Sequence, residues 1–415
     1  MREISCDVAV VGGGPAGATL AQRLGLLGFH VIVLEARPFP RHKPCGEFMN
    51  PASLEILEEL RVLENVASLG ARPIRGMKLF LHGRSAAGCY GNITDAGTRF
   101  RHGFAVRRER FDQVLLNAAL STPGVQALQP ATVSRVLRGA GGEVLGVEAR
   151  DAVGERVTVR SAFTIGADGV RSRVARELGV HRPTPWLDKL ALVTRYEHVP
   201  WGAFAEAHFY DGGYFACAPV DGGLLSLNAV VDRRAYLEAG LTPEEFLTRR
   251  LVAVPELRER LAAGRRCDPI RGIASMAGST TQQIFDGAAL VGDAAGYVDP
   301  VTGEGIYIAL RGSQLLAPVL ADALRRRDRS QRSLDAYRTA RRRELLPRRW
   351  SGLLLQRLLR SPMAKEAGIR ILARNPGLAD LAVSATGEDL PLRKLLLPSA
   401  ILRAFGGRPM ATAGT

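Results

Sequence analysis

A glycine-rich turn between a hydrophobic strand and a helix is the feature that most constrains how this chain can fold. DVAVV (7–11) is typical of a buried strand, GGGPAG follows it directly, and ATLAQRLGLLGF (18–29) then predicts a helix. HVIVLE (30–35) predicts a second strand. This order is that of a βαβ unit, so the front of the chain is expected to form an α/β fold on a parallel sheet.

The spacing of these glycines indicates what the turn binds. Gly12, Gly14 and Gly17 have GxGxxG spacing, and Glu35 ends the second strand about 20 residues later, as a dinucleotide fingerprint requires. Gly12 permits the tight turn, Gly14 lets the backbone approach a pyrophosphate, and Gly17 lets helix and strand pack closely. The helix N-terminus offers N–H groups to the phosphates, and Glu35 can accept hydrogen bonds from a ribose. An ordinary βα turn without a ligand is the alternative. The predicted dinucleotide site comprises Gly12, Gly14, Pro15, Ala16, Gly17, Glu35, Ala36 and Arg37.

Proteins that bind NAD and proteins that bind FAD share this fingerprint. Three later segments of the chain indicate which of the two cofactors is bound. AVRRERFDQVLLNAAL (105–120) begins with a basic cluster and continues as a helix. FTIGADGVRSRVARELG (163–179) predicts a strand, a turn at Asp168-Gly169 and a basic helix. GAALVGDAAGYVDPVTGEGIYIAL (287–310) predicts a strand ending at Gly292-Asp293, a loop, and a helix that opens at Gly303-Glu304-Gly305.

In this order, the four motifs resemble those of the FAD-dependent monooxygenase and reductase superfamily with the para-hydroxybenzoate hydroxylase type of fold. Within it, the chain looks most like the geranylgeranyl reductase family, and the resemblance covers residues 1–320. It implies that Arg108 contacts FAD, that Asp168 supports FAD and the route of the pyridine nucleotide, and that Asp293 holds the ribityl chain. It implies FAD as cofactor and NAD(P)H as electron donor. The residues implied at the GD motif and the isoalloxazine ring are Gly292, Gly303, Gly305 and Ile306.

The last motif also makes chemical sense without the resemblance. The sequence GEG at 303–305 cannot crowd a flat ring, and the helix behind it has leucines at i, i+4 spacing (316, 320 and 324). The N-terminus of that helix would stabilise the negative charge of a reduced flavin. A glycine turn without a ligand is the alternative.

RHKPCGEF (41–48) places one cysteine on the loop between the second strand and the next helix. Asn50 can cap that helix, and Pro51 suits its first position. In the family that the chain resembles, a K-x-C-G segment faces the flavin, so Cys45 and Gly46 are predicted to lie beside the cofactor. Cys45 is then either a catalytic or substrate-gating thiol, or a residue of loop packing.

The residue after this glycine departs from the prenyl reductase pattern. Glu47 stands where those reductases usually have a second glycine, so Glu47 joins Cys45 as a candidate catalytic residue. The Gly-Glu pair followed by Pro51 is similar to flavin-dependent halogenases. Those enzymes carry a W-x-W-x-I-P motif, which this chain lacks.

The domain organisation follows from the order of the motifs. We expect a discontinuous Rossmann-like FAD-binding domain (1–75, 100–180 and 275–320) with an inserted antiparallel β-sheet substrate domain (76–99 and 181–274). An arginine-rich helical C-terminal region (321–415) completes the chain. LALVTRYEHV, AFAEAHFY, GYFACAPV and LLSLNAVV predict strands of the substrate domain.

One of these strands bears on the substrate. GYFACAP (213–219) aligns with the prenyl reductase pattern G-Y-x-W-x-x-P, but Ala216 replaces the tryptophan, which opens space near the ring. Tyr214, Ala216 and Pro219 are the candidate substrate pocket. The aromatic residues of these strands either line an apolar pocket or pack in the core. They are Phe204, Phe209, Tyr210, Tyr214 and Phe215.

Composition limits the other partners. The formal net charge is +15, carried mostly by arginine, and no nucleic-acid-binding motif accompanies it, so no nucleic acid is expected. After residue 320, ADALRRRDRSQRSLDAYRTARRRELLPRRW is rich in arginine, and two amphipathic segments follow it, SGLLLQRLLR (351–360) and LRKLLLPSAILRAF (392–405), the second of which lies outside the residues that the structure describes. The basic and amphipathic segments either touch an anionic membrane or a lipid-like substrate, or close the substrate domain as solvated helices.

The 5 cysteines have no CxxC spacing, so neither a disulfide framework nor a metal site is expected. The absence of a secretory pattern or a long apolar run favours the cytoplasm.

The favoured hypothesis is a flavoenzyme in which NAD(P)H reduces FAD and the reduced flavin acts on a mostly apolar small molecule. GEGI and KPCG narrowly favour reduction of a carbon–carbon double bond, while Ala216 weakens the prenyl version. A monooxygenase that hydroxylates an aromatic or polyketide-like substrate is one alternative, and a halogenase is another. A non-catalytic lipid-binding escort protein of related fold is the alternative outside enzymes.

Overall fold

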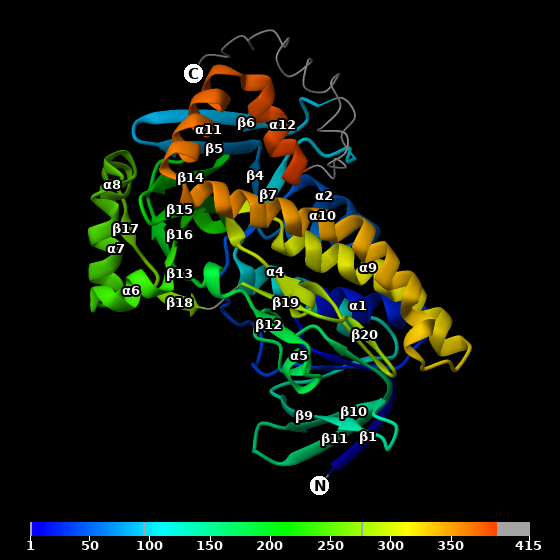
Figure 1. Ribbon diagram of the computed structural model, residues 1–415. Helices are drawn as coiled ribbons and strands as arrows, with labels where there is room; N and C mark the ends of the chain where they lie inside the picture. Colours follow the sequence, from blue (N-terminus) through cyan, green and yellow to red (C-terminus); the bar gives the residue numbers. More distant parts are fainter. Residues whose placement is uncertain (1, 94–96, 275–276, 388–415) are drawn as a thin grey trace.

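The protein contains two large β-sheets that are flanked by helices and joined by long α-helices at the C-terminal end (Figure 1). This architecture is that of a computed structural model, which describes residues 2–93, 97–274 and 277–387. In the first sheet, β1 lies between β11 and β2, and the order is β20-β21-β11-β1-β2-β8. Its strands are β1 (Arg2–Val11), β2 (Val31–Leu34), β8 (Val125–Leu128), β9 (Thr132–Arg138), β10 (Val144–Arg150), β11 (Arg156–Gly166), β20 (Ile284–Phe285) and β21 (Ala288–Leu290).

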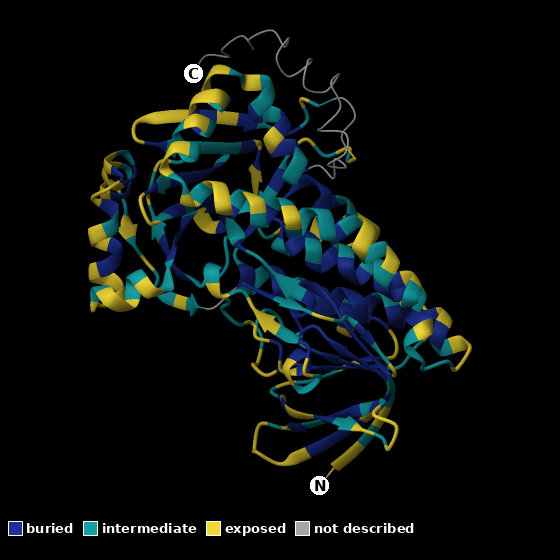
Figure 2. Cartoon of the chain, viewed as in Figure 1, coloured by how far each residue is buried: buried dark blue, intermediate teal, exposed yellow. Residues whose placement is uncertain are grey.

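Strand β1 carries apolar side chains on both faces of the first sheet, so both faces have to be buried against other elements. It pairs in parallel with β11 and β2, and its residues alternate between two apolar clusters. Val8 and Val10 face helices α1 (Pro15–Leu26) and α9 (Gly305–Arg325), whereas Ala9 and Val11 face the layer formed with β9 and β10. The buried end of β1 therefore leads into the glycine turn, and its other end is exposed near the N-terminus (Figure 2).

The second sheet has the order β17-β13-β16-β15-β14-β5-β6, with β18 paired to β13. Its four central strands match the alternating segments predicted between 190 and 231, and they pair antiparallel. Strand β14 joins the hairpin β5–β6 in parallel. The strands are β5 (Gly76–Leu81), β6 (Arg84–Cys89), β13 (Lys189–Glu197), β14 (Phe204–Tyr210), β15 (Gly213–Val220), β16 (Leu224–Asp232), β17 (Arg265–Arg266) and β18 (Arg271–Ala274).

Two small sheets link the large ones. The first joins β3 (Phe48–Met49), β7 (Gly103–Ala105) and β4 (Arg72–Ile74), and the second joins β12 (His181–Pro183), β19 (Gly278–Thr280) and β22 (Gly296–Tyr297). The remaining front helices are α2 (Pro51–Glu59), α3 (Leu63–Ala67), α4 (Arg108–Leu120) and α5 (Arg173–Glu177). As predicted, Asn50 caps α2, with its side chain accepting a hydrogen bond from the Ser53 amide, and Pro51 opens the helix.

Three helices interrupt the region that the alternating pattern predicted as strands only. These are α6 (Arg233–Ala239), α7 (Pro243–Leu251) and α8 (Pro255–Ala262), and α7 and α8 cover one face of the second sheet. Thr242 and Glu245 form a capping box at the start of α7, and Pro243 follows the cap. The S/T-x-x-E signature of this capping box is present in the sequence at 242–245, between the segments with strand patterns.

The C-terminal region is helical as far as it is described. It contains α10 (Asp335–Arg360), α11 (Pro362–Arg374) and α12 (Pro376–Gly387), while α9 continues to Arg325, across the expected boundary at 320. Helix α10 runs beside α9, and α11 and α12 pack on the hairpin β5–β6 (Figure 1). Within residues 2–93, 97–274 and 277–387, no helix is both long and apolar enough to cross a membrane.

Candidate functional site

A groove of about 590 Å³ runs along the carboxyl end of the first sheet, within the range of roughly 300–1,000 Å³ usual for small-molecule sites. The glycine turn forms its floor. Gly12 has a φ of +105°, and a Cβ there would lie 2.5 Å from the carbonyl oxygen of Ala167. A Cβ at Gly17 would lie 1.9 Å from the Gly12 oxygen, so the predicted close packing of helix and strand is present. Gly14 is the N-cap of α1. Because glycine has no side chain that could cap the helix, the first amides of α1 remain available to an anion.

Glu35 lines this groove, and the backbone orients its carboxylate. Its Oε2 accepts a hydrogen bond from the Gly13 amide at 2.9 Å, and its Oε1 accepts one from the Arg37 amide at 3.1 Å. The Arg41 guanidinium lies 3.3 Å from Oε1. Glu35 thus joins the glycine turn to the end of β2, and a ribose contact through its remaining lone pairs stays a prediction. Ala36 and Arg37 line the same groove.

Asp168 forms the opposite wall of the groove, but its carboxylate faces its own turn. It accepts hydrogen bonds from the Ser172 hydroxyl at 2.5 Å and from the amides of Arg173 and Val174 at 2.6 and 3.2 Å. Burial raises the pKa of Asp168, and these donors oppose that effect. These hydrogen bonds hold the turn at Gly169, where φ is +79°, against the start of α5, and the support of FAD by Asp168 stays a prediction.

Basic side chains surround this groove. An anion bound there would face several positive charges together with the amides of α1, as a pyrophosphate requires. The basic lining residues are Arg37, Arg41, His42, Lys43, Arg171, Arg173 and Arg271.

A second, smaller and largely apolar cavity continues from the groove. Lys43, Pro44, Val170 and Ile273 line both, so groove and cavity form one connected site. The cavity lies between the 43–48 loop, the strands β13, β15, β16 and β18, and the start of α9. Its remaining lining residues include Pro15, Cys45, Gly46, Glu47, Phe48, Arg108, Ala191, Val193, Ala216, Asn228, Val230, Asp293, Tyr297, Pro300, Gly303, Gly305, Ile306 and Ala309.

The GD motif contributes a carboxylate that has no hydrogen-bond partner among the residues that the structure describes. Asp293 lines the cavity, and its side chain makes no hydrogen bond to any residue that the structure describes. Burial raises the pKa of Asp293, and the charges of Lys43 and Arg108 lower it. Gly292, with a φ of +61°, brings the motif against α1, since a Cβ there would lie 2.9 Å from the Ala16 side chain. Gly303 has a φ of +67° and lies against Phe48.

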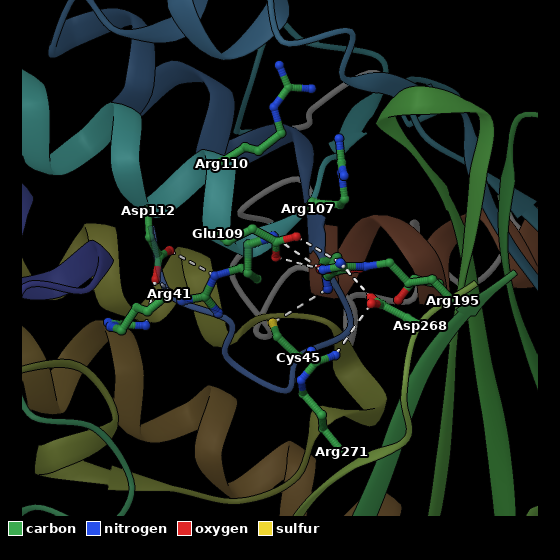
Figure 3. Close-up of polar contacts among 12 residues, drawn as sticks. Arg41, Cys45, Arg107, Glu109, Arg110, Asp112, Arg195, Asp268 and Arg271 are labelled. Carbon is green, nitrogen blue, oxygen red and sulfur yellow. Dashed lines mark hydrogen bonds and ion pairs between the residues drawn. The ribbon is translucent and has the colours of Figure 1, made fainter. Parts of the chain in front are cut away.

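A chain of buried charges holds Arg108 at the cavity. Its Nε and Nη2 donate to the two carboxylate oxygens of Asp112 at 2.9 and 3.0 Å, and its guanidinium also contacts the Cys45 thiol. Arg41 lies 3.3 Å from the same Asp112 and continues the chain to Glu35. Through these contacts, Arg108, Asp112, Arg41 and Glu35 connect the cavity to the groove, and Figure 3 shows Asp112 beside Arg41.

Glu47 is part of a second ion-pair network that the sequence did not predict. It has a φ of +58°, and its side chain is 1% exposed. Arg195 on β13 pairs with both Glu47 oxygens, one of them through Nε at 3.1 Å, and also binds Glu109 at 2.7 Å and Asp268 at 2.9 Å (Figure 3). Burial raises the pKa of Glu47, and Arg195 opposes this effect. Glu47 thus lines the cavity while its carboxylate is held by the network.

Cys45 is partly buried and points toward this cluster (Figure 3). Its Sγ accepts a hydrogen bond from the Glu47 amide at 3.5 Å. Among the described residues, no group of three or more His, Cys, Asp and Glu could hold a metal ion. The thiol therefore lies between the Arg108 guanidinium and the Glu47 amide, at the edge of an apolar cavity.

Of the three residues predicted to form the substrate pocket, one lines the cavity and two do not. Ala216 lines the cavity, whereas Tyr214 and Pro219 do not line it and are buried in the second sheet. The Tyr214 hydroxyl donates to Asp299 Oδ1 at 2.7 Å, and burial raises the pKa of Asp299 to about 6. Tyr214 thereby anchors the loop before Gly303 to the sheet. The other aromatic residues of these strands also pack in or against the core clusters or stay outside the cavity lining.

Comparison with known proteins shows which family and which proteins the chain is similar to. The sequence model of a family described as "FAD binding domain" matches residues 5–345. The chain is 27% identical to digeranylgeranylglycerophospholipid reductase of Methanothrix thermoacetophila, over 93% of this chain and 92% of that one. It is 26% identical to 6-methylpretetramide 4-monooxygenase of Streptomyces rimosus, over 81% and 80%.

Solved structures add halogenases to these relatives. The myxobacterial chondrochloren halogenase CndH, described as an FAD-dependent halogenase, superposes with a TM-score of 0.78 and 26% identity over 98% of both chains. The chain spans only 62% of the length of another flavin-dependent halogenase, CmlS. Reductases, monooxygenases and halogenases are thus all among the relatives, at similar identity.

Proposed function

This chain belongs to the FAD binding domain family and is an FAD-dependent oxidoreductase, and within that class we propose that it reduces a carbon–carbon double bond of a mostly apolar small molecule. One observation carries the proposal: the Cys45 thiol lines an apolar cavity together with Gly303, Gly305 and Ile306. Reduction of a double bond needs a proton for the second carbon, and a thiol is a group that can supply one.

The residues present fit FAD. The groove offers an α1 N-terminus and basic side chains to a pyrophosphate, and Glu35 stands at the position of the ribose contact. The Asp293 carboxylate, which has no partner in the described part of the chain, can accept hydrogen bonds from the ribityl hydroxyls, and glycines at 303 and 305 leave room for a flat ring. When bound and reduced, FAD supplies two electrons to the substrate. A complete groove of this kind also argues against the non-catalytic escort hypothesis.

The protein's own groups would then orient the substrate and provide the proton. Apolar residues such as Val193, Ala216 and Val230 exclude water from the cavity, and the start of α9 points its amides toward it. Glu47 is committed to Arg195, so it serves to fix the 43–48 loop, which leaves Cys45 as the proposed proton donor. NAD(P)H is the proposed electron donor, and the basic mouth of the groove would attract its phosphates.

Substitution of Cys45 tests the proposed proton transfer. We expect Cys45→Ser to keep its full flavin content but to lose about 100-fold or more in turnover, because a hydroxyl is a far weaker acid than a thiol. Flavin absorbance of the purified protein and steady-state rates measure the two effects. Cys6→Ser is the matched control, since Cys6 lies on β1, away from the cavity lining. Unchanged turnover in Cys45→Ser would return Cys45 to loop packing.

Oxygenation or halogenation is the second candidate function, and the match to a halogenase over 98% of the chain is the observation that favours it. The reaction of the reduced protein with oxygen separates the candidates. The flavin is reduced anaerobically with NADPH or NADH, mixed rapidly with oxygenated buffer, and followed by absorbance with and without candidate substrates. Direct return to the oxidised spectrum in every case supports the reductase, whereas a long-lived intermediate spectrum would favour the second candidate. Comparing the two donors in the first step shows which one the protein uses.

A further inference from the structure

A second pocket, here called the arginine pocket, lies behind the segment that borders the flavin cavity. It is bounded by residues 295–305 on one side and by the Arg341, Arg342, Arg348 and Arg349 face of α10 on the other. Tyr297 and Gly305 line both the arginine pocket and the cavity. A ligand in the arginine pocket would therefore contact the same segment that lines the cavity.

Most of the positive charge in this pocket lacks a counter-charge. Arg348 pairs with Glu304 and stacks on Tyr307. In contrast, Arg341, Arg342 and Arg349 have no carboxylate within ion-pair distance among the described residues. The other acidic lining residue is Asp299, which is held by the Tyr214 hydroxyl and the Val301 amide.

Two of these guanidinium groups also have buried nitrogens without hydrogen-bond partners. Arg341 donates from Nη2 to the Ala295 carbonyl at 3.0 Å, but its Nη1 is buried and bonds to nothing that the structure describes. Arg349 makes no hydrogen bond within the described chain, and its Nε is buried. Burial, and then the nearby charge of Arg341, lowers the pKa of Arg349. Buried cations are normally paired, so this arrangement lacks an anion.

We propose that the arginine pocket binds a phosphate group. The three unpaired arginines, set against Asp299, leave an excess of about two positive charges, which matches the roughly −1.5 to −2 of a phosphate at neutral pH better than a carboxylate or a halide does. Guanidinium groups also present paired N–H donors that fit the oxygens of a phosphate. This inference stands independently of which reaction the flavin supports.

The phosphate could come from solution or from a phospholipid head group. The solvent-exposed face of α10 has a feature that favours the head group. Its solvent face carries Trp350, Leu354 and Leu358 at i, i+4 spacing, and they are 63%, 60% and 48% exposed. An apolar stripe beside a phosphate pocket is the arrangement by which an amphipathic helix would lie on a lipid surface.

Calorimetric titration of the flavin-loaded protein with inorganic phosphate at pH 7 tests the proposal. We expect saturable binding to the wild type and at least ten-fold weaker binding to Arg349→Gln, since hydrogen bonds to charged groups contribute about 1.5–3 kcal/mol. Arg349→Lys should bind with intermediate affinity, because it keeps the charge without the paired donors. Arg343→Gln is the control, since the Arg343 side chain is 81% exposed and does not line the pocket.

The comparison anion is chloride at equal ionic strength. Equal responses to chloride and phosphate, or unchanged phosphate affinity in both Arg349 variants, would overturn the assignment. Cosedimentation with phosphatidic acid vesicles, compared with phosphatidylcholine vesicles, then separates the sources. Binding that Arg349→Gln and free phosphate both reduce would identify the head group as ligand, whereas phosphate binding without vesicle binding would identify the soluble anion.

Discussion

Asp293→Ala is expected to weaken FAD binding about 10- to 100-fold while leaving the apoprotein folded. The Asp293 carboxylate lines the cavity without a partner among the described residues, so bound FAD would be the group that uses it. Loss of a hydrogen bond to a charged group costs about 1.5–3 kcal/mol, which corresponds to that range of affinity. Titration of apoprotein with FAD, followed by quenching of flavin fluorescence, measures the change.

The stability of the apoprotein provides the internal control. Burial raises the pKa of Asp293 in the folded state, so ionisation of this carboxyl opposes folding, and stability contributed by its protonated form is lost as the pH rises. Removing it should therefore leave the apoprotein's melting temperature at pH 8 unchanged or higher. Asp322→Ala on α9, where Asp322 is 60% exposed, should change neither property. Wild-type FAD affinity in Asp293→Ala would contradict the ribityl assignment.

The parts of the site that the sequence predicts are those carried by local motifs. The glycine turn, the Asp168-Gly169 turn and the Gly292-Asp293 motif each need a specific residue because the backbone is left-handed or another segment passes close by. Such steric requirements act within a few residues and therefore leave a readable pattern. For the same reason, the Asn50 cap and the Pro51 helix start were predictable.

The parts that the sequence does not predict depend on contacts between distant segments. Glu47 and Arg195 are 148 residues apart in sequence, and no local pattern marks Arg195 on β13 as the partner of a loop glutamate. A charged residue on a strand is usually solvated, so Arg195 gives no signal until the sheet and the 43–48 loop come together. The arginine pocket is hidden for the same reason, because its charges on α10 become a site only against residues 295–305. Tyr214 shows the opposite error, since a family pattern suggested a pocket residue where the hydroxyl anchors a loop.

Arg195→Met is expected to lower the free energy of unfolding by about 3–5 kcal/mol, the usual cost of removing one partner of a buried ion pair. The Arg195 side chain is 4% exposed and the Glu47 side chain 1%, so the substitution would leave a carboxylate buried without its cation. Methionine fills similar space, which makes lost packing a minor contribution. Urea denaturation followed by circular dichroism measures the change. Arg265→Met is the control, because its pair with Glu197 is at the surface, with Arg265 80% exposed, and such pairs contribute about 0–1 kcal/mol.

The pH dependence identifies the buried carboxylate as the cause. Burial already raises the pKa of Glu47, and loss of Arg195 removes the group that opposes this, so folded Arg195→Met would hold a proton that the unfolded chain releases. Its stability should then fall as the pH rises, which makes the deficit relative to wild type larger at pH 8 than at pH 5. The double variant Glu47→Gln/Arg195→Met should recover part of the loss and most of its pH dependence. A deficit of the same size at both pH values, unrelieved in the double variant, would mean that Arg195 stabilises the fold through Glu109 and Asp268 or through packing, and not through Glu47.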